Sequence, residues 1–233
     1  VPSATSAGDG VLSNEVTSVL NTEFGVSSPT VLANHVMLCM PPGAMSGIAY
    51  ANLPGWRSVY SDQWCSYLSA QMHEVGHNIG LHHSNEAAAY QDQSGMMGYS
   101  YSQDDGPKMC FNAAKNWQLG WYASRQLLFE DKIWNGRLIG QVDHENLNAD
   151  PDDKVVIKLN TASNTDYYLM FNRKAGVNAG TIEGGNQVMI VSQPGEGNSP
   201  GQSVLLSKMN AGGVYTIPNF DNSGVELTVT VNS

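Results

Sequence analysis

The fold of this chain is constrained most by the stretch 71–83, which reads Q-M-H-E-V-G-H-N-I-G-L-H-H. His73 and His77 are four residues apart, so in a helix they share one face. Two imidazoles on one helix face can bind a single metal ion, and nitrogen ligands of this kind favour zinc. Glu74 would then lie beside the metal, where it could take a proton from a metal-bound water molecule.

A third histidine can reach the same metal only if the helix ends before it. His83 lies six residues after His77 and would face away on an uninterrupted helix. Gly80 is placed to end the helix, because glycine adopts the left-handed conformation at little steric cost. Three protein ligands leave a position for water, which is typical of a catalytic zinc site. His82 is the alternative third ligand, but the spacing from the glycine favours His83.

Composition and charge exclude several classes of protein. With 233 residues, the chain is long enough for one large domain or two modest ones. A hydrophobic content of 41% argues against disorder, and no apolar run is long enough to span a membrane. The net charge of −10 disfavours nucleic acid and anionic membrane surfaces as partners. We expect a secreted, extracellular monomer, which starts at Val1 without a leader and would be a processed form.

Three cysteines, Cys39, Cys65 and Cys110, occur without a C-x-x-C pair, so a thiolate metal site is not expected. In an extracellular protein two of them would pair, and the sequence does not decide which two. A bond between Cys65 and Cys110 is preferred, because these residues flank the predicted site. The alternative is that all three are buried thiols.

The first half of the chain alternates predicted helices and strands. A capping serine and apolar spacing predict a helix over 13–24. Strands are predicted over 31–40, 47–53 and 56–60, the second of them at a sheet edge. Residues 112–119 predict a short helix that ends at Gly120.

The helix that carries the histidine pair is predicted to begin at Ser61 or Asp62. A stripe of apolar residues runs along it and is expected to face the core, with the histidines on an adjoining face. The stripe consists of Trp64, Leu68, Met72, Val75 and Ile79.

After residue 122 the pattern changes to short runs of β-branched and aromatic residues between turns. Such runs predict an antiparallel β-sandwich. The runs are 132–140, 154–160, 167–172, 187–192, 204–208, 213–217 and 225–231. The chain is therefore predicted to be α+β, with domains at 1–125 and 126–233.

A group of acidic residues follows the predicted domain boundary and could bind calcium. It comprises Asp143, Glu145, Asp150, Asp152 and Asp153. Because their spacing does not match an EF-hand, a solvated loop is the favoured interpretation.

Several motifs together resemble a known family of proteases. H-E-V-G-H-N-I-G-L-H-H followed by S-G-M-M-G-Y-S resembles the metzincin zinc endopeptidases, which have an extended zinc motif and a Met-turn. S-V-Y-S-D-Q-W-C, Y-Q-D-Q-S-G-M-M-G-Y-S-Y and C-F-N-A-A-K-N-W-Q-L-G-W-Y resemble the gametolysin family, secreted algal proteases that act on cell-wall or matrix proteins. The resemblance is strongest over 31–125. It implies a twisted mixed sheet with an active-site helix and a C-terminal helix.

The resemblance also implies roles for individual residues. His73, His77 and His83 correspond to the zinc ligands, and Glu74 to the general base. Met97 corresponds to the Met-turn methionine, with Met96 as the competing choice.

Tyr99 matches a position where some metzincins place a tyrosine near zinc, and its hydroxyl could stabilise an oxyanion. A packed tyrosine is the alternative. The segment 99–107 would then form a wall of the substrate pocket.

The implied reaction is zinc-dependent hydrolysis of peptide bonds in extracellular, cell-wall or matrix proteins. An extended peptide could pair with an edge strand, because backbone pairing accepts many sequences. The residues predicted to bind it are Gly47, Ile48, Ala49, Tyr50 and Ala51. The alternative function is a binding module, in which the β-rich tail holds a matrix glycoprotein or polysaccharide.

Overall fold

The computed structural model describes residues 4–98, 108–130, 133–146, 148–195 and 200–232. It has mixed α and β structure, which confirms the predicted α+β class. The described residues form two compact units, one that ends at Leu81 and one that begins at His82. None of the described helices is long and apolar enough to span a membrane.

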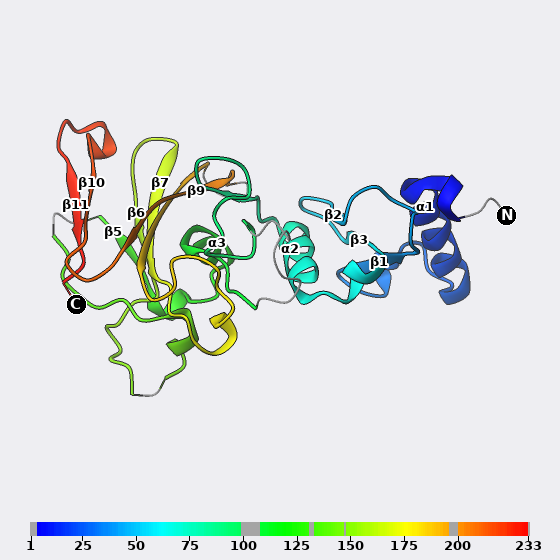
Figure 1. The fold of residues 1–233 in the computed structure, drawn as a ribbon, viewed down its shortest axis with the longest axis horizontal. Helices are drawn as coiled ribbons and strands as arrows, with labels where there is room; N and C mark the ends of the chain where they lie inside the picture. The colour runs from blue at the N-terminus through cyan, green and yellow to red at the C-terminus, as the bar shows by residue number, and fades with distance from the viewer. Residues whose placement is uncertain (1–3, 99–107, 131–132, 147, 196–199, 233) are drawn as a thin grey trace. The chain divides into compact units, whose positions relative to one another are not determined.

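The first unit is built on a three-stranded sheet with the order β1-β3-β2. β1 (Val36–Met40) is parallel to β3 (Arg57–Ser61), and β3 is antiparallel to β2 (Ala49–Ala51). Each strand lies within or beside a predicted one, and β2 is an edge strand as predicted. Helices α1 (Ala4–Phe24) and α2 (Leu68–Asn78) lie on opposite sides of this sheet (Figure 1).

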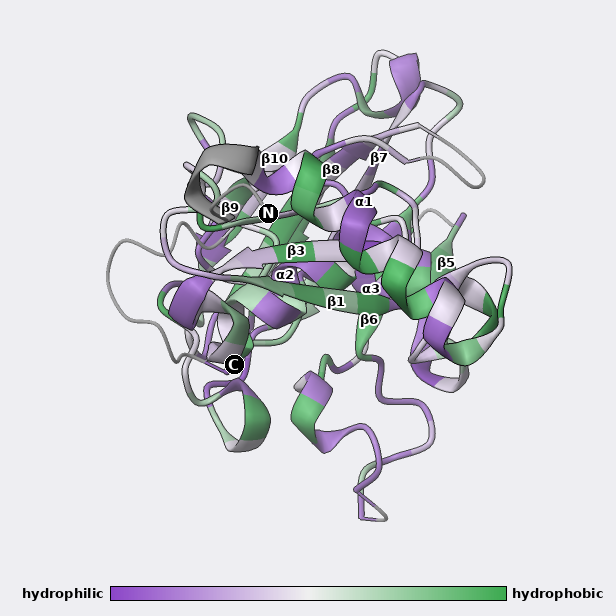
Figure 2. Ribbon diagram, turned by 90° about the vertical axis from the view of Figure 1, so that its right-hand side faces the viewer, coloured by the Kyte–Doolittle hydropathy of each residue, from purple (hydrophilic) through white to green (hydrophobic). Residues whose placement is uncertain are grey.

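Helix α1 extends further toward the N-terminus than the predicted helix and contains a break at Gly8. Apolar and polar residues alternate around it, as the colours of Figure 2 show. Leu12 packs on the small core of the sheet. Four apolar side chains of this helix remain exposed: Val11, Val16, Val19 and Phe24. Ser13 does not cap the helix; it is buried, and Arg57 donates a hydrogen bond to its hydroxyl over 2.7 Å.

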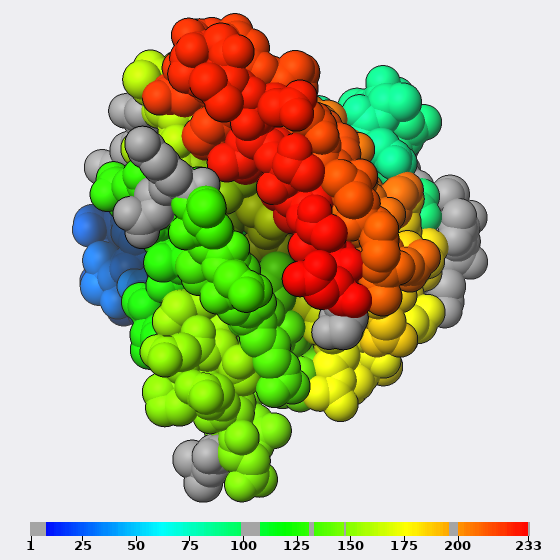
Figure 3. All heavy atoms as spheres, turned by 90° about the vertical axis from the view of Figure 1, so that its left-hand side faces the viewer, coloured from blue at the N-terminus to red at the C-terminus, as the bar shows by residue number. Residues whose placement is uncertain are grey.

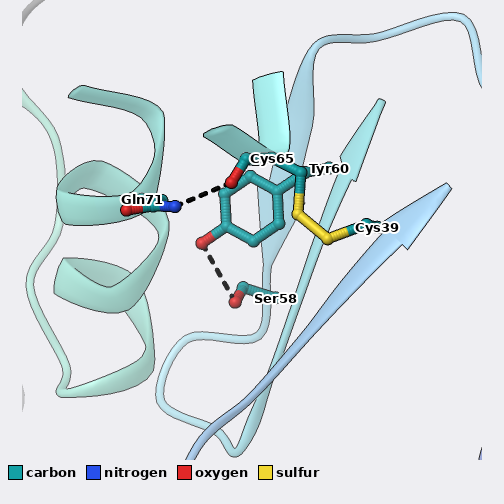
Figure 4. The surroundings of a disulfide bond; sticks show 5 residues. All are labelled: Cys39, Ser58, Tyr60, Cys65 and Gln71. Atoms are coloured by element: carbon teal, nitrogen blue, oxygen red, sulfur yellow. Dashed lines mark hydrogen bonds between the residues drawn. A yellow bond between two sulfur atoms is a disulfide. The ribbon is translucent and has the colours of Figure 1, made fainter. Parts of the chain in front are cut away.

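A disulfide bond joins Cys39 and Cys65, whose Cα atoms are 5.5 Å apart (Figure 4). The predicted bond between Cys65 and Cys110 is therefore wrong. The sheet explains the pairing, because its register places Cys39 opposite Tyr60, and the 3-10 turn Asp62–Ser66 follows at once. Cys110 is a half-buried thiol, and burial raises its pKa to about 11.

The second unit contains a six-stranded sheet with the order β4-β9-β8-β7-β6-β5. The two outer pairs, β4 with β9 and β5 with β6, are parallel, and the three inner pairs are antiparallel. The strands are β4 (Ser84–Asn85), β5 (Gln126–Phe129), β6 (Val156–Leu159), β7 (Thr165–Phe171), β8 (Val188–Pro194) and β9 (Ser203–Met209).

Both faces of this sheet are covered, because its strands are apolar on both sides. Helix α3 (Ala113–Leu119) packs on one face, in contact with residues such as Val156, Met170 and Val191. The hairpin of β10 (Val214–Ile217) and β11 (Leu227–Thr230) packs on the other. Figure 3 shows this hairpin, in red, lying across the outside of the unit.

Local sequence signals predicted much of this unit. Helix α3 begins after Asn112, which caps it, and ends at Gly120 in the left-handed conformation. Six of the predicted runs overlap the strands β6 to β11. The run 132–140 was wrong as a strand, since its described part contributes only isolated bridges at Leu138 and Gly140. The mixed sheet does not confirm an antiparallel sandwich, and the domain boundary near residue 125 stays a prediction.

Replacing Cys39 and Cys65 by alanine should lower the free energy of unfolding by about 2–4 kcal/mol, because the crosslink no longer restricts the unfolded chain. Urea unfolding measures the change, and Cys110→Ala is the single-thiol control. Peptide mapping without reductant should show Cys39 linked to Cys65. A linked peptide that contains Cys110 would contradict this assignment.

A fragment of residues 1–125 should fail to fold, because the cut removes the strands that bury Ala113 and Ala114 of α3. Circular dichroism during thermal unfolding should show no cooperative transition in the fragment, whereas the full chain should show one. A cooperative transition in the fragment would instead support two separable domains.

Candidate metal centre

Helix α2 turns its polar face inward. Its buried residues are Ser69, Ala70, His73, Glu74, Gly76, His77 and Asn78. The apolar stripe that was predicted to face the core is not buried: Leu68 is 37% exposed and the other four members are half-buried. The prediction that this apolar stripe faces the core was therefore wrong, because the face that carries the two histidines is the buried one.

The helix also begins later than predicted. Residues Asp62–Ser66 form a 3-10 turn, and Tyr67 precedes the first residue of α2. The Gln71 side chain donates a hydrogen bond to the Cys65 carbonyl over 2.7 Å, which links the helix to the disulfide (Figure 4).

His73 and His77 lie one helical turn apart, with ring centroids 4.8 Å from each other. His77 Nδ1 is 2.7 Å from the carbonyl oxygen of Leu81. Because a carbonyl oxygen only accepts hydrogen bonds, Nδ1 carries the proton and the lone pair of the neutral ring lies on Nε2. A backbone partner of this kind orients a metal-binding imidazole.

Gly80 ends the helix as predicted. It has a φ of 93°, in the region that favours glycine. Its amide donates to the carbonyl of His77, and the amide of Leu81 donates to the carbonyl of Gly76, both over 2.9 Å. These two bonds form a Schellman motif, which satisfies carbonyl groups at the end of the helix and reverses the chain.

The reversed chain brings His83 to the helical pair. The ligand-capable nitrogen atoms of His73, His77 and His83 all lie within 4.8 Å of one another. His82 is not part of this group, and burial lowers its pKa, with a smaller contribution from Lys115. In the part of the chain that the structure describes, no other group of histidine, cysteine or acidic side chains has this geometry.

The acidic loop that was considered for calcium is accordingly not supported as a metal site. Asp143 pairs with Arg173, and Asp153 is buried beside Arg137. The amide of Asp152 donates to the Asp150 side chain, as in an ordinary turn.

The environment of Glu74 indicates that a metal ion fits beside the three histidines. Glu74 is 4% exposed, and its Oε2 atom has no hydrogen-bond partner among the residues that the structure describes. Burial raises its pKa to about 7. An unpartnered buried carboxylate oxygen costs free energy, so such an atom next to a histidine group is expected where a bound ion or substrate completes the site.

The glycine and methionine turn after the helix is described up to Gly98. Met96 and Met97 are fully buried. The Met96 amide donates a hydrogen bond to the Cys110 carbonyl over 3.1 Å, and the Met97 carbonyl accepts one from the Ser84 amide over 3.0 Å. A side chain at Gly98 would overlap the backbone of Asp92, so only glycine fits this position. Tyr99 and the segment 99–107 lie outside the described residues.

The residues predicted to bind substrate lie at the edge of the first sheet. Ala49, Tyr50 and Ala51 form β2, which pairs only with β3 in the described sheet. The carbonyl of Ile48 accepts from Ser61 over 2.8 Å, and Gly47 directly precedes it. Their role in binding stays a prediction.

A family comparison agrees with this geometry. The model of the family described as gametolysin peptidase M11 matches residues 15–170, which is more than half of the chain and includes all three histidines. The chain belongs to the gametolysin peptidase family. The predicted resemblance to gametolysin is thus confirmed, and the family implies a metallopeptidase that acts on proteins. No curated protein and no solved structure gave a match.

Several buried polar residues next to this site were not found from the sequence. They are Asp92, Asn112, Lys115 and Ser203, which come from three separate segments, because Asn112 and Lys115 both belong to the start of α3. Each is an ordinary surface residue type, and only the burial of all four in one place shows that they form a group.

Gly80→Ala should lower the free energy of unfolding by about 1–2 kcal/mol, because a side chain is strained at this positive φ. Zinc affinity, measured by competition with a chelator, should fall as well. Gly10→Ala is the control, since Gly10 lies in α1 with open space around it. A Gly80→Ala variant with unchanged stability and zinc affinity would show that the helix can end without glycine.

Proposed function

We propose that this chain is a secreted zinc-dependent endopeptidase that hydrolyses peptide bonds of extracellular matrix or cell-wall proteins. One observation carries the proposal: three imidazoles converge beside a buried glutamate with an unpartnered oxygen, in a chain of a metallopeptidase family. In this proposal the metal is held by His73, His77 and His83.

The donor set favours zinc. Neutral imidazole nitrogens suit this ion, and three protein ligands leave a coordination position for substrate or water. When bound, zinc supplies Lewis acidity, which polarises a peptide carbonyl and makes a water molecule more acidic. The protein supplies the orientation of the ligands, for which the bond from His77 to the Leu81 carbonyl is the clearest support.

Glu74 moves the protons in this mechanism. Its carboxylate takes a proton from the attacking water and passes it to the nitrogen of the leaving amine. Its Oε2 atom, which has no hydrogen-bond partner in the described part of the chain, is available for this exchange. Burial raises its pKa to about 7, and a bound cation would lower that pKa and favour the ionised form that acts as a base.

Two further residues complete the proposed site. Met97, which is 1% exposed, would provide an apolar floor for the metal. Tyr99 is proposed to donate a hydrogen bond to the oxyanion that develops on the scissile carbonyl. The support for Tyr99 is its position two residues after Met97.

The substrate is proposed to bind as an extended strand along the edge formed by residues 47–51. β2 has a partner on one side only among the described strands, so its other edge offers backbone donors and acceptors. Pairing of this kind binds peptides without strong selection of their side chains.

Extracellular action is supported by the disulfide bond between Cys39 and Cys65, because such bonds persist in oxidising compartments. We propose that the protein acts as a monomer. The β-rich segment 126–233, predicted as a β-sandwich accessory domain, is proposed to support the catalytic part.

Glu74→Ala should reduce kcat for a casein-derived peptide by about 100-fold or more, because the proton acceptor is lost. The variant should still bind one equivalent of zinc, measured by metal analysis after dialysis. Glu23→Gln, at an exposed position in α1, is the control and should keep full activity. A Glu74→Ala variant that cleaves at the rate of the unchanged protein would exclude Glu74 as the base.

A further inference from the structure

The residue after the third histidine is part of the large sheet. Ser84 begins β4, which pairs in parallel with β9, and Ser84 lies opposite Ser203. The Ser203 amide donates to the carbonyl of His83 over 3.1 Å. The Ser84 amide in turn donates to the carbonyl of Met97 over 3.0 Å. The backbone at His83 and Ser84 is thus held both by β9 and by the methionine turn, the segment 94–98 that contains Met97.

The side chains at this junction form a buried polar cluster, which consists of Ser84, Asp92, Asn112 and Ser203. All four are at most 2% exposed. The amide nitrogen of the Asn112 side chain lies 3.0 Å from the hydroxyls of Ser84 and Ser203 and 2.9 Å from the Asp92 carboxylate. The Ser203 hydroxyl donates to the Ser84 hydroxyl over 3.0 Å.

Two residues connect the polar cluster to its surroundings. Asp92 accepts hydrogen bonds from the amide and the hydroxyl of Ser94, at the start of the methionine turn. Asn112 also caps α3, where its side-chain oxygen accepts from the Lys115 amide over 3.2 Å. Three stretches of the chain, 84–94, 112–115 and the start of β9 at Ser203, therefore meet at the residue that follows His83.

The arrangement is more specific than a stable core requires. Apolar residues of similar size often give a protein equal or greater stability than a buried polar group. Hydrogen bonds are directional, however, and each buried donor left without a partner costs free energy. Because its hydrogen bonds depend on exact positions, the cluster penalises any shift of Ser84 by more than a fraction of an ångström. His83 is restrained with it, because the two residues are consecutive in the chain.

We propose that Ser203 and Asn112 are positioning residues for the third metal ligand. They hold the backbone at His83 in its ligating position before the metal binds, so that binding does not have to order this segment. A strand near the C-terminal end of the chain is then part of the support of the metal centre. The inference rests on the proposed zinc site and assigns a function to residues outside the zinc motif.

Ser203→Ala tests the proposal in the full chain. Outer partners of metal ligands commonly contribute 10- to 100-fold in affinity, so we expect the Kd for zinc to rise about tenfold. The measurement is competition with a chromophoric chelator, with the visible spectrum of the cobalt-substituted protein as a second readout. The spectrum should change in the variant, because the geometry of the third ligand relaxes.

The matched control is Thr161→Val, which also removes a buried hydroxyl from the second unit. Thr161 is 4% exposed and donates to the Thr165 carbonyl over 2.9 Å, and none of its hydrogen bonds involves the cluster. Both variants should lose some stability in urea unfolding of the metal-free chain. Only Ser203→Ala should lose zinc affinity, and equal losses of affinity in the two variants would overturn the proposal.

A second variant tests the proposal independently if Ser203→Ala does not fold. Asn112→Ser keeps a hydroxyl that can cap α3 but removes the amide that joins the cluster. It should also raise the Kd for zinc about tenfold. Zinc binding as tight as in the unchanged protein, in either folded variant, would overturn the positioning role and leave the proposed peptidase function intact. An unchanged protein that binds no zinc would instead overturn the proposed function itself.

Hydrogen exchange gives a test that needs no variant. If the cluster holds this segment in advance, the Ser84 amide should exchange slowly in the metal-free chain. Zinc should then slow it by less than tenfold. Exchange in the metal-free chain as fast as that of an exposed loop amide would show that the metal orders the segment, and the proposal would be wrong.

Discussion

The end of helix α2 at Gly80 is the constraint on which the metal centre depends. A helix that continued would carry His83 about 240° around its axis from His77. The positive φ of Gly80 instead lets the amides of residues 80 and 81 bond back to the helix. The same turn places the Leu81 carbonyl against His77, so one local structure ends the helix, reverses the chain and orients a ligand.

Helix α2 also departs from the usual pattern, because it buries its polar face. Helix α2 buries two histidines and Glu74 and leaves much of its apolar stripe partly exposed. Burial of a carboxylate with an unpartnered oxygen is unfavourable, and the rise of the Glu74 pKa to about 7 expresses that cost. Departures of this kind from ordinary patterning are expected at functional sites, where the fold retains an arrangement that stability alone would not favour.

The large sheet holds the residue that follows the third histidine. The edge strand β4 is only two residues long, yet it follows His83 directly and pairs with β9. Period-two alternation in β6 to β9 sends apolar side chains to both faces, where α3 and the hairpin cover them. The sheet is thereby packed on both faces, and Ser84 is joined to it by pairing with β9.

The sequence alone determined the features that depend on local spacing. The interval of four between His73 and His77, the glycine at the helix end, helix α3 and the positions of six strands all follow from residues close together in the chain. Only the tertiary structure decided which distant segments meet. It paired Cys39 with Cys65, joined Ser84 to β9 and gathered three polar residues around Asn112. The physical reason is that periodicity reports which face of an element is buried, whereas pairing depends on the packing of the whole chain.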